Sequence, residues 1–190
     1  DIKLNRKGFF YMSIVIINGS PRKRGRTGIA SRFIARTYDC DLIDLSDGSL
    51  PLYNGEQDQP EIESVRALKQ KVKGAEAVIL ASPEYHSGMS GTLKNALDFL
   101  SSEQFAHKPV ALLACAGGGK GGINCLNNLR IVGRGVYANV IPKQLILDPH
   151  CFDYEGDGLL EEPAKLVDDL MRELKVYVKA AELVKSEISS

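Results

Sequence analysis

The sequence predicts an α/β fold with one doubly wound sheet of five parallel strands and helices on both faces. Five short apolar runs alternate with segments whose apolar residues recur every three or four positions. This alternation is typical of a parallel sheet covered by helices. The first, third and fourth runs are apolar nearly throughout, as strands buried on both faces are. No repeat or change of composition suggests a second domain.

The first strand is expected over residues 13–18 (SIVIIN), because four β-branched residues stand in a row there. A helix over residues 27–37 follows, with its apolar residues spaced for one face. The second strand, residues 40–45 (CDLIDL), carries Asp41 and Asp44. Charged side chains suit the edge of a sheet better than its centre.

The next helix is expected over residues 60–75, where Pro60 suits the first turn and Gly74 the end. Its apolar residues recur at intervals of three and four. Residues 76–82 (EAVILAS) form the third strand, and residues 90–102 form one continuous helix.

The fourth strand is expected over residues 108–116, followed by a helix over residues 122–136 and a fifth strand over residues 139–147. A final amphipathic helix runs from about residue 159 to 188. Residues 46–59 form one long polar loop, which is either functional or a plain surface connection.

The length of 190 residues fits one domain, which we expect over residues 12–190. We interpret residues 1–11 as an extension foreign to the domain, with a native arm as the alternative. Lysine plus arginine and aspartate plus glutamate number 24 each. A nucleic-acid-binding domain is usually basic, so we expect no nucleic-acid partner. No apolar run approaches the roughly 20 residues that span a bilayer, so we expect no membrane partner either.

The four cysteines favour a reducing compartment, and we expect the cytoplasm. None stands in a CxxC pair, and no cysteine–histidine spacing resembles a zinc site, so we expect no metal. Cys115 lies in an apolar run and reads as a small buried residue. His107 and His150 have no partner pattern and are expected at the surface.

Five such strands most naturally take the flavodoxin-like order 2-1-3-4-5, which places a ligand crevice between strands 1 and 3. The segments that leave the carboxyl ends of those two strands are residues 18–28 and 82–90. Residues 18–28 (NGSPRKRGRTG) hold four cations within five positions. The crevice predicted from the fold and the cationic loop predicted from composition therefore coincide.

A glycine-rich turn before a helix makes an anion site from backbone N–H groups and the helix dipole. Ser20 and Thr27 add hydroxyl donors there, and Arg22 and Arg26 add cations. The alternative is a turn whose cations are merely solvated. The spacing of the glycines does not match the loop of nucleotide triphosphatases.

The second crevice segment favours a planar ring. Residues 82–101 (SPEYHSGMSGTLKNALDFLS) begin with rigid or flat side chains and continue with glycines that let a ligand approach the backbone. The segment AGGGKGG (116–122) offers exposed N–H groups for the other side of such a ring. It also contains G-x-G-x-x-G, but after the fourth strand and without the acidic residue expected about 20 positions on, so we interpret that match as accidental. A phosphate and a flat heterocycle together predict flavin mononucleotide, FMN.

At this point the chain resembles the NADPH-dependent FMN reductases, and within them the bacterial FMN-dependent azobenzene reductases. The resemblance rests on NGSPRKRGRTG, on SPEYHSGMSGTLKNALDFLS and on LLACAGGGKGGINCLNN. The family pattern G-S-x-R-x-x-S-x-N maps onto Ser20, Arg22, Gly25 and Thr27, with Gly25 and Thr27 departing from it. The family's P-E-Y-[NH]-x-[SG] signature matches, without a gap, Pro83, Glu84, Tyr85, His86, Ser87 and Gly88.

The resemblance implies an enzyme with non-covalent FMN that takes hydride from NADPH, with NADH as a second donor, in a ping-pong scheme. The acceptor would be an azo dye, a quinone or a second flavin. It also implies a homodimer or homotetramer. The alternatives are an electron-transfer flavodoxin and a flavin-bound sensor, neither of which turns over NADPH.

The same resemblance assigns roles around the flavin. The charge of the reduced ring would be stabilised by the backbone N–H groups of Gly117, Gly118 and Gly119, aided by Lys120. Glu84 would serve through its backbone more than its carboxylate. Tyr85 would stack or form a hydrogen bond, or simply pack. His86 would either donate a proton to an azo nitrogen or only shape the pocket.

Overall fold

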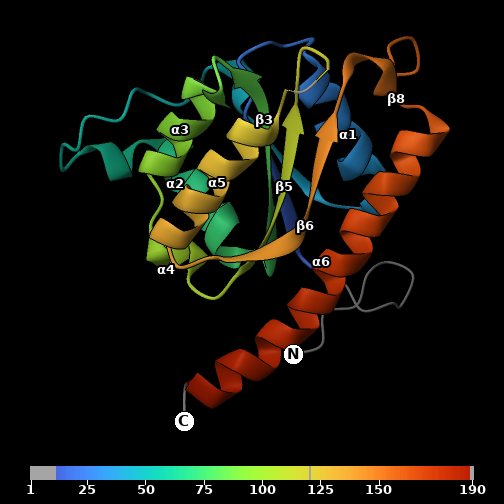
Figure 1. Cartoon of the computed structure of the whole chain (residues 1–190). Coiled ribbons are helices and arrows are strands. Elements are labelled where there is room, and N and C mark those ends of the chain that lie inside the picture. Colours follow the sequence, from blue (N-terminus) through green and yellow to red (C-terminus); the bar gives the residue numbers. More distant parts are fainter. Residues whose placement is uncertain (1–11, 120, 189–190) are drawn as a thin grey trace.

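The computed structural model describes residues 12–119 and 121–188, so residues 1–11, Lys120 and residues 189–190 lie outside the described part. Five long strands form a parallel sheet in the order β2-β1-β3-β5-β6 (Figure 1). Their bounds are β1 (Ile14–Asn18), β2 (Asp41–Asp44), β3 (Ala77–Tyr85), β5 (Pro109–Cys115) and β6 (Asn139–Leu147). Numbered along the chain, these strands have the predicted order 2-1-3-4-5, and β2 lies at an edge as expected.

Two layers of helices cover the sheet (Figure 1). One face carries α1 (Arg26–Tyr38) and α6 (Glu161–Ile188). The other carries α2 (Glu63–Gly74), α3 (Gly91–Asp98), α4 (Ser102–Phe105) and α5 (Ile123–Gly135). Within β1, Ile14 and Ile16 pack on the first layer, whereas Val15 and Ile17 pack on the second. Because successive side chains point to opposite faces, a strand buried on both faces must be continuously apolar.

The prediction of one helix over residues 90–102 is wrong in one respect, because the helix is interrupted between α3 and α4. Ser101 accepts a hydrogen bond from the backbone N–H of Glu103, and Gln104 reaches back to the backbone N–H of Ser101 over 2.9 Å. This reciprocal capping starts a new helix at Ser102. The first helix therefore ends at Asp98.

The third strand is longer than the predicted 76–82. It continues to Tyr85, turns back, and pairs antiparallel with β4 (Gly88–Met89). The predicted crevice segment 82–90 thus contains a short hairpin attached to the sheet. This hairpin fixes the backbone of the second crevice segment.

The long loop 46–59 is an ordered surface connection. It begins in a 3-10 turn, η1 (Leu45–Asp47), and ends in another, η2 (Gln59–Glu61). The buried amide of Gln59 donates to the carbonyl of Leu52 over 2.7 Å and accepts from the N–H of Asn54 over 2.9 Å. Side-chain amides thus replace the backbone ladder that the loop lacks.

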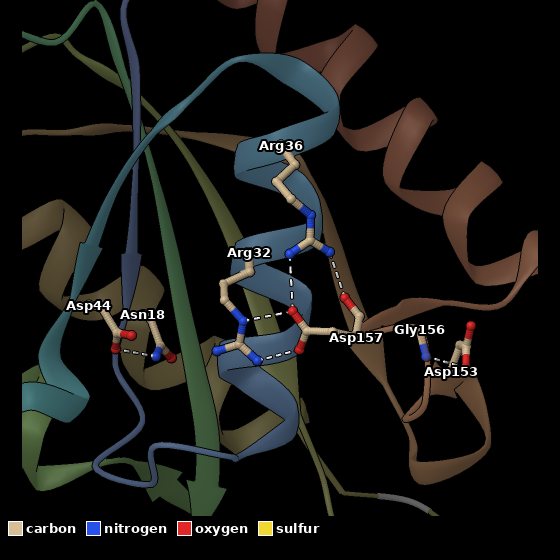
Figure 2. Close-up of polar contacts among 7 residues, drawn as sticks. All are labelled: Asn18, Arg32, Arg36, Asp44, Asp153, Gly156 and Asp157. Carbon is tan, nitrogen blue, oxygen red and sulfur yellow. Dashed lines mark hydrogen bonds and ion pairs between the residues drawn. The ribbon is translucent and has the colours of Figure 1, made fainter.

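A second hairpin follows β6 and the turn η3 (Pro149–Cys151). It consists of β7 (Phe152–Asp153) and β8 (Gly158–Leu159), and it was not predicted. Asp157, just before β8, is clamped by two arginines of α1, as Figure 2 shows. Arg32 Nε donates to its carboxylate over 2.9 Å and Arg36 Nη1 over 3.0 Å. The hydrogen bonds from Arg32, followed by those from Arg36, lower the pKa of Asp157 to about 2.

The four cysteines are free thiols. Cys115, Cys125 and Cys151 are buried, and Cys40 is half-buried. Burial raises the pKa of Cys40 and of Cys115 to about 12, and that of Cys125 to about 11. These thiols therefore stay protonated at neutral pH.

Two absences concern the described residues alone. No helix there combines the length and the apolar character that crossing a membrane requires. Within the same ranges, no group of three or more histidine, cysteine or acidic side chains could hold a metal ion. His107 and His150 are exposed, as expected.

Candidate functional site

The candidate site lies at the carboxyl ends of β1, β3 and β5, where three segments leave the sheet along one edge. We call them the basic loop (residues 19–25), the β3–β4 hairpin (residues 83–88) and the glycine loop (residues 117–119). Because the strands are parallel and adjacent, their carboxyl ends bring these three segments together.

The basic loop is anchored where it leaves β1. Gly19 donates its N–H to the carbonyl of Ala81 over 2.8 Å, which ties the loop to β3. A Cβ at Gly19 would lie 2.7 Å from Cβ of Leu93, so only glycine lets the loop pass this close to α3. The hydroxyl of Ser90 donates to the carbonyl of Gly19 and also caps α3, because it accepts the N–H of Leu93 over 3.0 Å.

Asn18 sets the path of the loop from the end of β1. Its amide nitrogen donates to the carboxylate of Asp44 over 2.7 Å, as Figure 2 shows. Its amide oxygen accepts the N–H of Ser20 over 3.1 Å. The hydroxyl of Ser20 in turn accepts the N–H of Arg22 over 3.1 Å. Sequence reasoning missed Asn18, although a polar residue at the end of an apolar strand was a visible signal.

The N-terminus of α1 has free donors. Gly25 occupies the cap position, where no side chain accepts a hydrogen bond, and the first turn contains no acidic residue. The first backbone bond of the helix runs from the N–H of Ile29 to the carbonyl of Gly25, so the preceding N–H groups have no intrahelical acceptor. An anion fits such an end.

Two buried hydroxyls and a close approach shape the same place. Ser20 and Thr27 are each about 2% exposed or less. A Cβ at Gly25 would lie 2.9 Å from Oγ of Ser20, so a side chain there would push that hydroxyl away. Gly25, which departs from the family pattern, thus keeps room at the helix end. The residues present fit a phosphate group.

Four cations surround this helix end. Arg22, Lys23 and Arg24 are exposed and Arg26 is half-buried. Within the described residues none of them forms an ion pair. The guanidinium of Arg22 instead lies over the ring of Tyr85, with Cζ 5.7 Å from the ring centroid. The cations of the loop are therefore available to a ligand.

The β3–β4 hairpin turns through His86 and Ser87, which are both exposed and both left-handed, with φ of 49° and 62°. A two-residue turn with positive φ at both positions suits the twist of a hairpin, but asparagine and glycine adopt it more easily. Tyr85 and Gly88 form the pair that the turn connects. Pro83, before them, is buried.

Glu84 has a structural task. Its carboxylate accepts the N–H of Cys125 over 2.9 Å, in the first turn of α5. A carboxylate at a helix N-terminus satisfies a free donor and complements the helix dipole. This bond ties the hairpin to α5, and sequence reasoning did not foresee it.

The glycine loop is exposed at Gly117, Gly118 and Gly119, and the last two have φ of 125° and 77°. A Cβ at Gly117 or Gly119 would meet nothing within 4 Å. Further on, Gly122 has φ of 95°, and a Cβ there would lie 2.9 Å from Ile146, so the chain needs glycine to enter α5. The expected contribution of Lys120 falls outside the described residues. Open backbone of this kind fits a flat group.

A family model described as NADPH-dependent FMN reductase matches residues 12–151. The NADPH azoreductase of Bacillus sp. (strain OY1-2) is 52% identical over 178 residues, which cover 93% of this chain and 98% of that protein. The FMN-dependent NADPH-azoreductase of Staphylococcus aureus (strain USA300) is 31% identical over 159 residues, covering 77% of this chain and 82% of that protein.

A solved structure shares the fold. The flavoenzyme NAD(P)H:(acceptor) oxidoreductase FerB of Paracoccus denitrificans superposes with a TM-score of 0.72 at 21% identity, over 90% of this chain and 98% of that one. The family match covers the basic loop, the β3–β4 hairpin and the glycine loop. The chain therefore belongs to the NADPH-dependent FMN reductase family.

Proposed function

We propose that this protein uses FMN to transfer electrons from NADPH to azo compounds, quinones or a second flavin. The observation that carries the proposal is the uncapped N-terminus of α1 beside four cations that form no ion pair within the described residues, at the edge of the sheet where the β3–β4 hairpin and the glycine loop lie. The relatives named as azoreductases supply the substrate class.

The phosphate of FMN would lie at the basic loop. Arg22 and Arg26 supply cations, Ser20 and Thr27 supply hydroxyls, and the first turn of α1 supplies backbone N–H groups. We rank Lys23 and Arg24 behind Arg22 and Arg26. Non-covalent binding follows, because every one of these contacts is a hydrogen bond or a charge interaction.

The flavin ring would lie between the β3–β4 hairpin and the glycine loop. Pro83, Glu84, Ser87 and Gly88 present backbone and small groups to it, since the carboxylate of Glu84 is already engaged with α5. The N–H groups of the glycine loop, aided by Lys120, would stabilise the charge that the ring gains on reduction.

The chemistry that FMN supplies when bound is acceptance of a hydride from NADPH and its transfer to the acceptor in a second half-reaction. The chain's own residues bind and orient. His86 is exposed at the tip of the hairpin, where it can reach an acceptor from solvent, either to donate a proton to an azo nitrogen or to shape the entrance.

The electron-transfer flavodoxin and the flavin-bound sensor are not favoured. Flavodoxins are usually acidic with a hydroxyl-rich loop, whereas this chain has balanced charge and a cationic loop. The relatives at 52% and 31% identity are named as NADPH-dependent enzymes.

We further propose a homodimer or homotetramer in the cytoplasm, with NADPH as the hydride donor and NADH as an alternative donor. Large apolar side chains exposed along α6, such as Val176 and Leu183, support a contact between copies. The free thiols of the four cysteines support a reducing compartment. Light scattering of the purified protein would measure the number of copies.

A steady-state panel tests the proposal. The purified protein should be yellow or should bind added FMN, and it should oxidise NADPH faster when an azo dye, a quinone or free FMN is present. NADH is run in parallel with each acceptor. A protein that binds no FMN would overturn the assignment, and one that binds FMN without consuming either nicotinamide would restore the flavodoxin alternative.

A further inference from the structure

The contact between Arg22 and Tyr85 joins two of the three segments of the site. Arg22 belongs to the basic loop and Tyr85 ends β3. With Cζ at 5.7 Å from the ring centroid, the cation lies where the negative face of the aromatic ring attracts it. Tyr85 is half-buried and Arg22 is exposed, so the ring provides a fixed surface for a side chain that is otherwise free.

The backbone around both residues is held by other bonds. Gly19 is joined to Ala81 of β3 and to the hydroxyl of Ser90. Tyr85 is paired with Gly88 across the two-residue turn. Because these bonds fix the spacing of the loop and the strand, the contact sets the direction of the Arg22 side chain.

The contact with one ring leaves donors of the guanidinium free. Its five N–H donors lie in one plane and point in different directions, so those not turned toward the ring can still bind a phosphate. An unrestrained arginine loses much rotamer freedom when it binds. An arginine already held against a ring loses less.

We propose that Tyr85 is a positioning residue, which holds the guanidinium of Arg22 ready for the phosphate of FMN. Tyr85 thereby acts on the phosphate end of the cofactor and not on its ring. This inference rests on the proposed function, because it takes the basic loop to bind that phosphate.

Riboflavin tests the inference, because it has the ring and the ribityl chain of FMN but no phosphate. Dissociation constants of both flavins for the apoprotein are measured by quenching of flavin fluorescence. Tyr85→Leu should raise the dissociation constant of FMN about three- to tenfold and leave that of riboflavin unchanged. Tyr85→Phe should retain wild-type affinity for FMN, since its ring keeps the negative face. In an Arg22→Ala background, Tyr85→Leu should have no further effect.

Two outcomes would overturn the inference: an equal loss of affinity for both flavins in Tyr85→Leu, or additive losses in the double variant. Either would mean that Tyr85 contacts the flavin independently of Arg22. Thermal melting of each apoprotein checks its folding, and Tyr85→Met replaces Tyr85→Leu if the latter does not fold. If the wild-type protein binds neither flavin, the proposed function itself fails, and that result differs from both of the others.

Discussion

The amide of Asn18 donates a hydrogen bond to the carboxylate of Asp44 over 2.7 Å, and this bond links the ends of the two neighbouring strands β1 and β2 (Figure 2). It also orients the amide, so that the oxygen of Asn18 faces the N–H of Ser20. A residue that touches no ligand itself thus sets the start of the basic loop.

Replacing Asn18 by alanine should loosen the first residues of the basic loop. The N–H of Ser20 and the carboxylate of Asp44 both lose a partner, and an unpaired buried group costs about 1–3 kcal/mol. We expect a lower melting temperature and weaker FMN binding. The control is Asp44→Asn, which keeps an acceptor oxygen and should change both much less. Calorimetry and an FMN titration measure the two effects, and unchanged FMN affinity in Asn18→Ala would separate this bond from the site.

Arg22→Ala should weaken FMN binding roughly 10- to 100-fold, because it removes a charge-assisted hydrogen bond to the phosphate. Lys23→Ala is the matched control, since Lys23 is an exposed cation of the same loop. It should lower the affinity slightly, by an amount that added salt screens. Fluorescence titration compares the two variants, and equal effects would show that the loop acts only through its total charge.

Gly25→Ala should weaken FMN binding about tenfold. The backbone at Gly25 has φ of −81°, which alanine adopts without strain, so the effect is steric and arises 2.9 Å away at Oγ of Ser20. Gly91→Ala is the control, because a Cβ there meets nothing within 4 Å. A wild-type dissociation constant in Gly25→Ala would mean that the position of Ser20 does not affect binding.

Glu84→Ala should lower the free energy of unfolding by about 1 kcal/mol, because the N–H of Cys125 loses its acceptor at the start of α5. For a chain of this size, that loss corresponds to roughly 2–4 °C in melting temperature. Glu84→Gln keeps an oxygen acceptor and should recover part of the difference. Thermal melts of the three apoproteins give the comparison, and an alanine variant as stable as the wild type would argue against the cap.

The clamp on Asp157 should make stability depend on pH in the acid range. Its pKa is lowered to about 2, so the folded state binds fewer protons than the unfolded state between about pH 4 and pH 2. The stabilisation is therefore complete above about pH 4 and is lost as the pH falls toward 2. After allowance for partial exposure, we expect Asp157→Asn to be about 1 kcal/mol less stable at pH 7. Urea unfolding should show a smaller difference in unfolding free energy between the wild type and Asp157→Asn at pH 3 than at pH 7. An equal difference at both pH values would contradict the clamp.

The strand order could be predicted because a strand that is buried on both faces appears in the sequence as a continuous run of apolar residues. Ile14 to Ile17 read as a central strand, and Asp41 and Asp44 mark the edge strand. The break after Asp98 was not predicted, since leucine spacing continues across it. The capping of Ser101 by Gln104, which decides that break, depends on local geometry more than on periodicity.

The location of the site followed from topology, whereas its internal contacts did not. Residues 83–88 contain no asparagine or glycine at the turn, so His86 and Ser87 gave no hairpin signal. The hydrogen bond from Cys125 to Glu84 spans 41 positions, and the contact between Arg22 and Tyr85 likewise joins two segments far apart in the sequence. Contacts between segments so far apart in the chain leave no pattern that spacing could show.

The protonated state of the cysteines affects how readily they are oxidised. A flavin that is reduced in air yields hydrogen peroxide, which attacks thiolates far faster than thiols. Cys115 ends the strand that leads into the glycine loop, yet burial keeps the pKa of this thiol at about 12. Burial thus protects the thiol nearest the glycine loop from oxidation by peroxide that forms at the site.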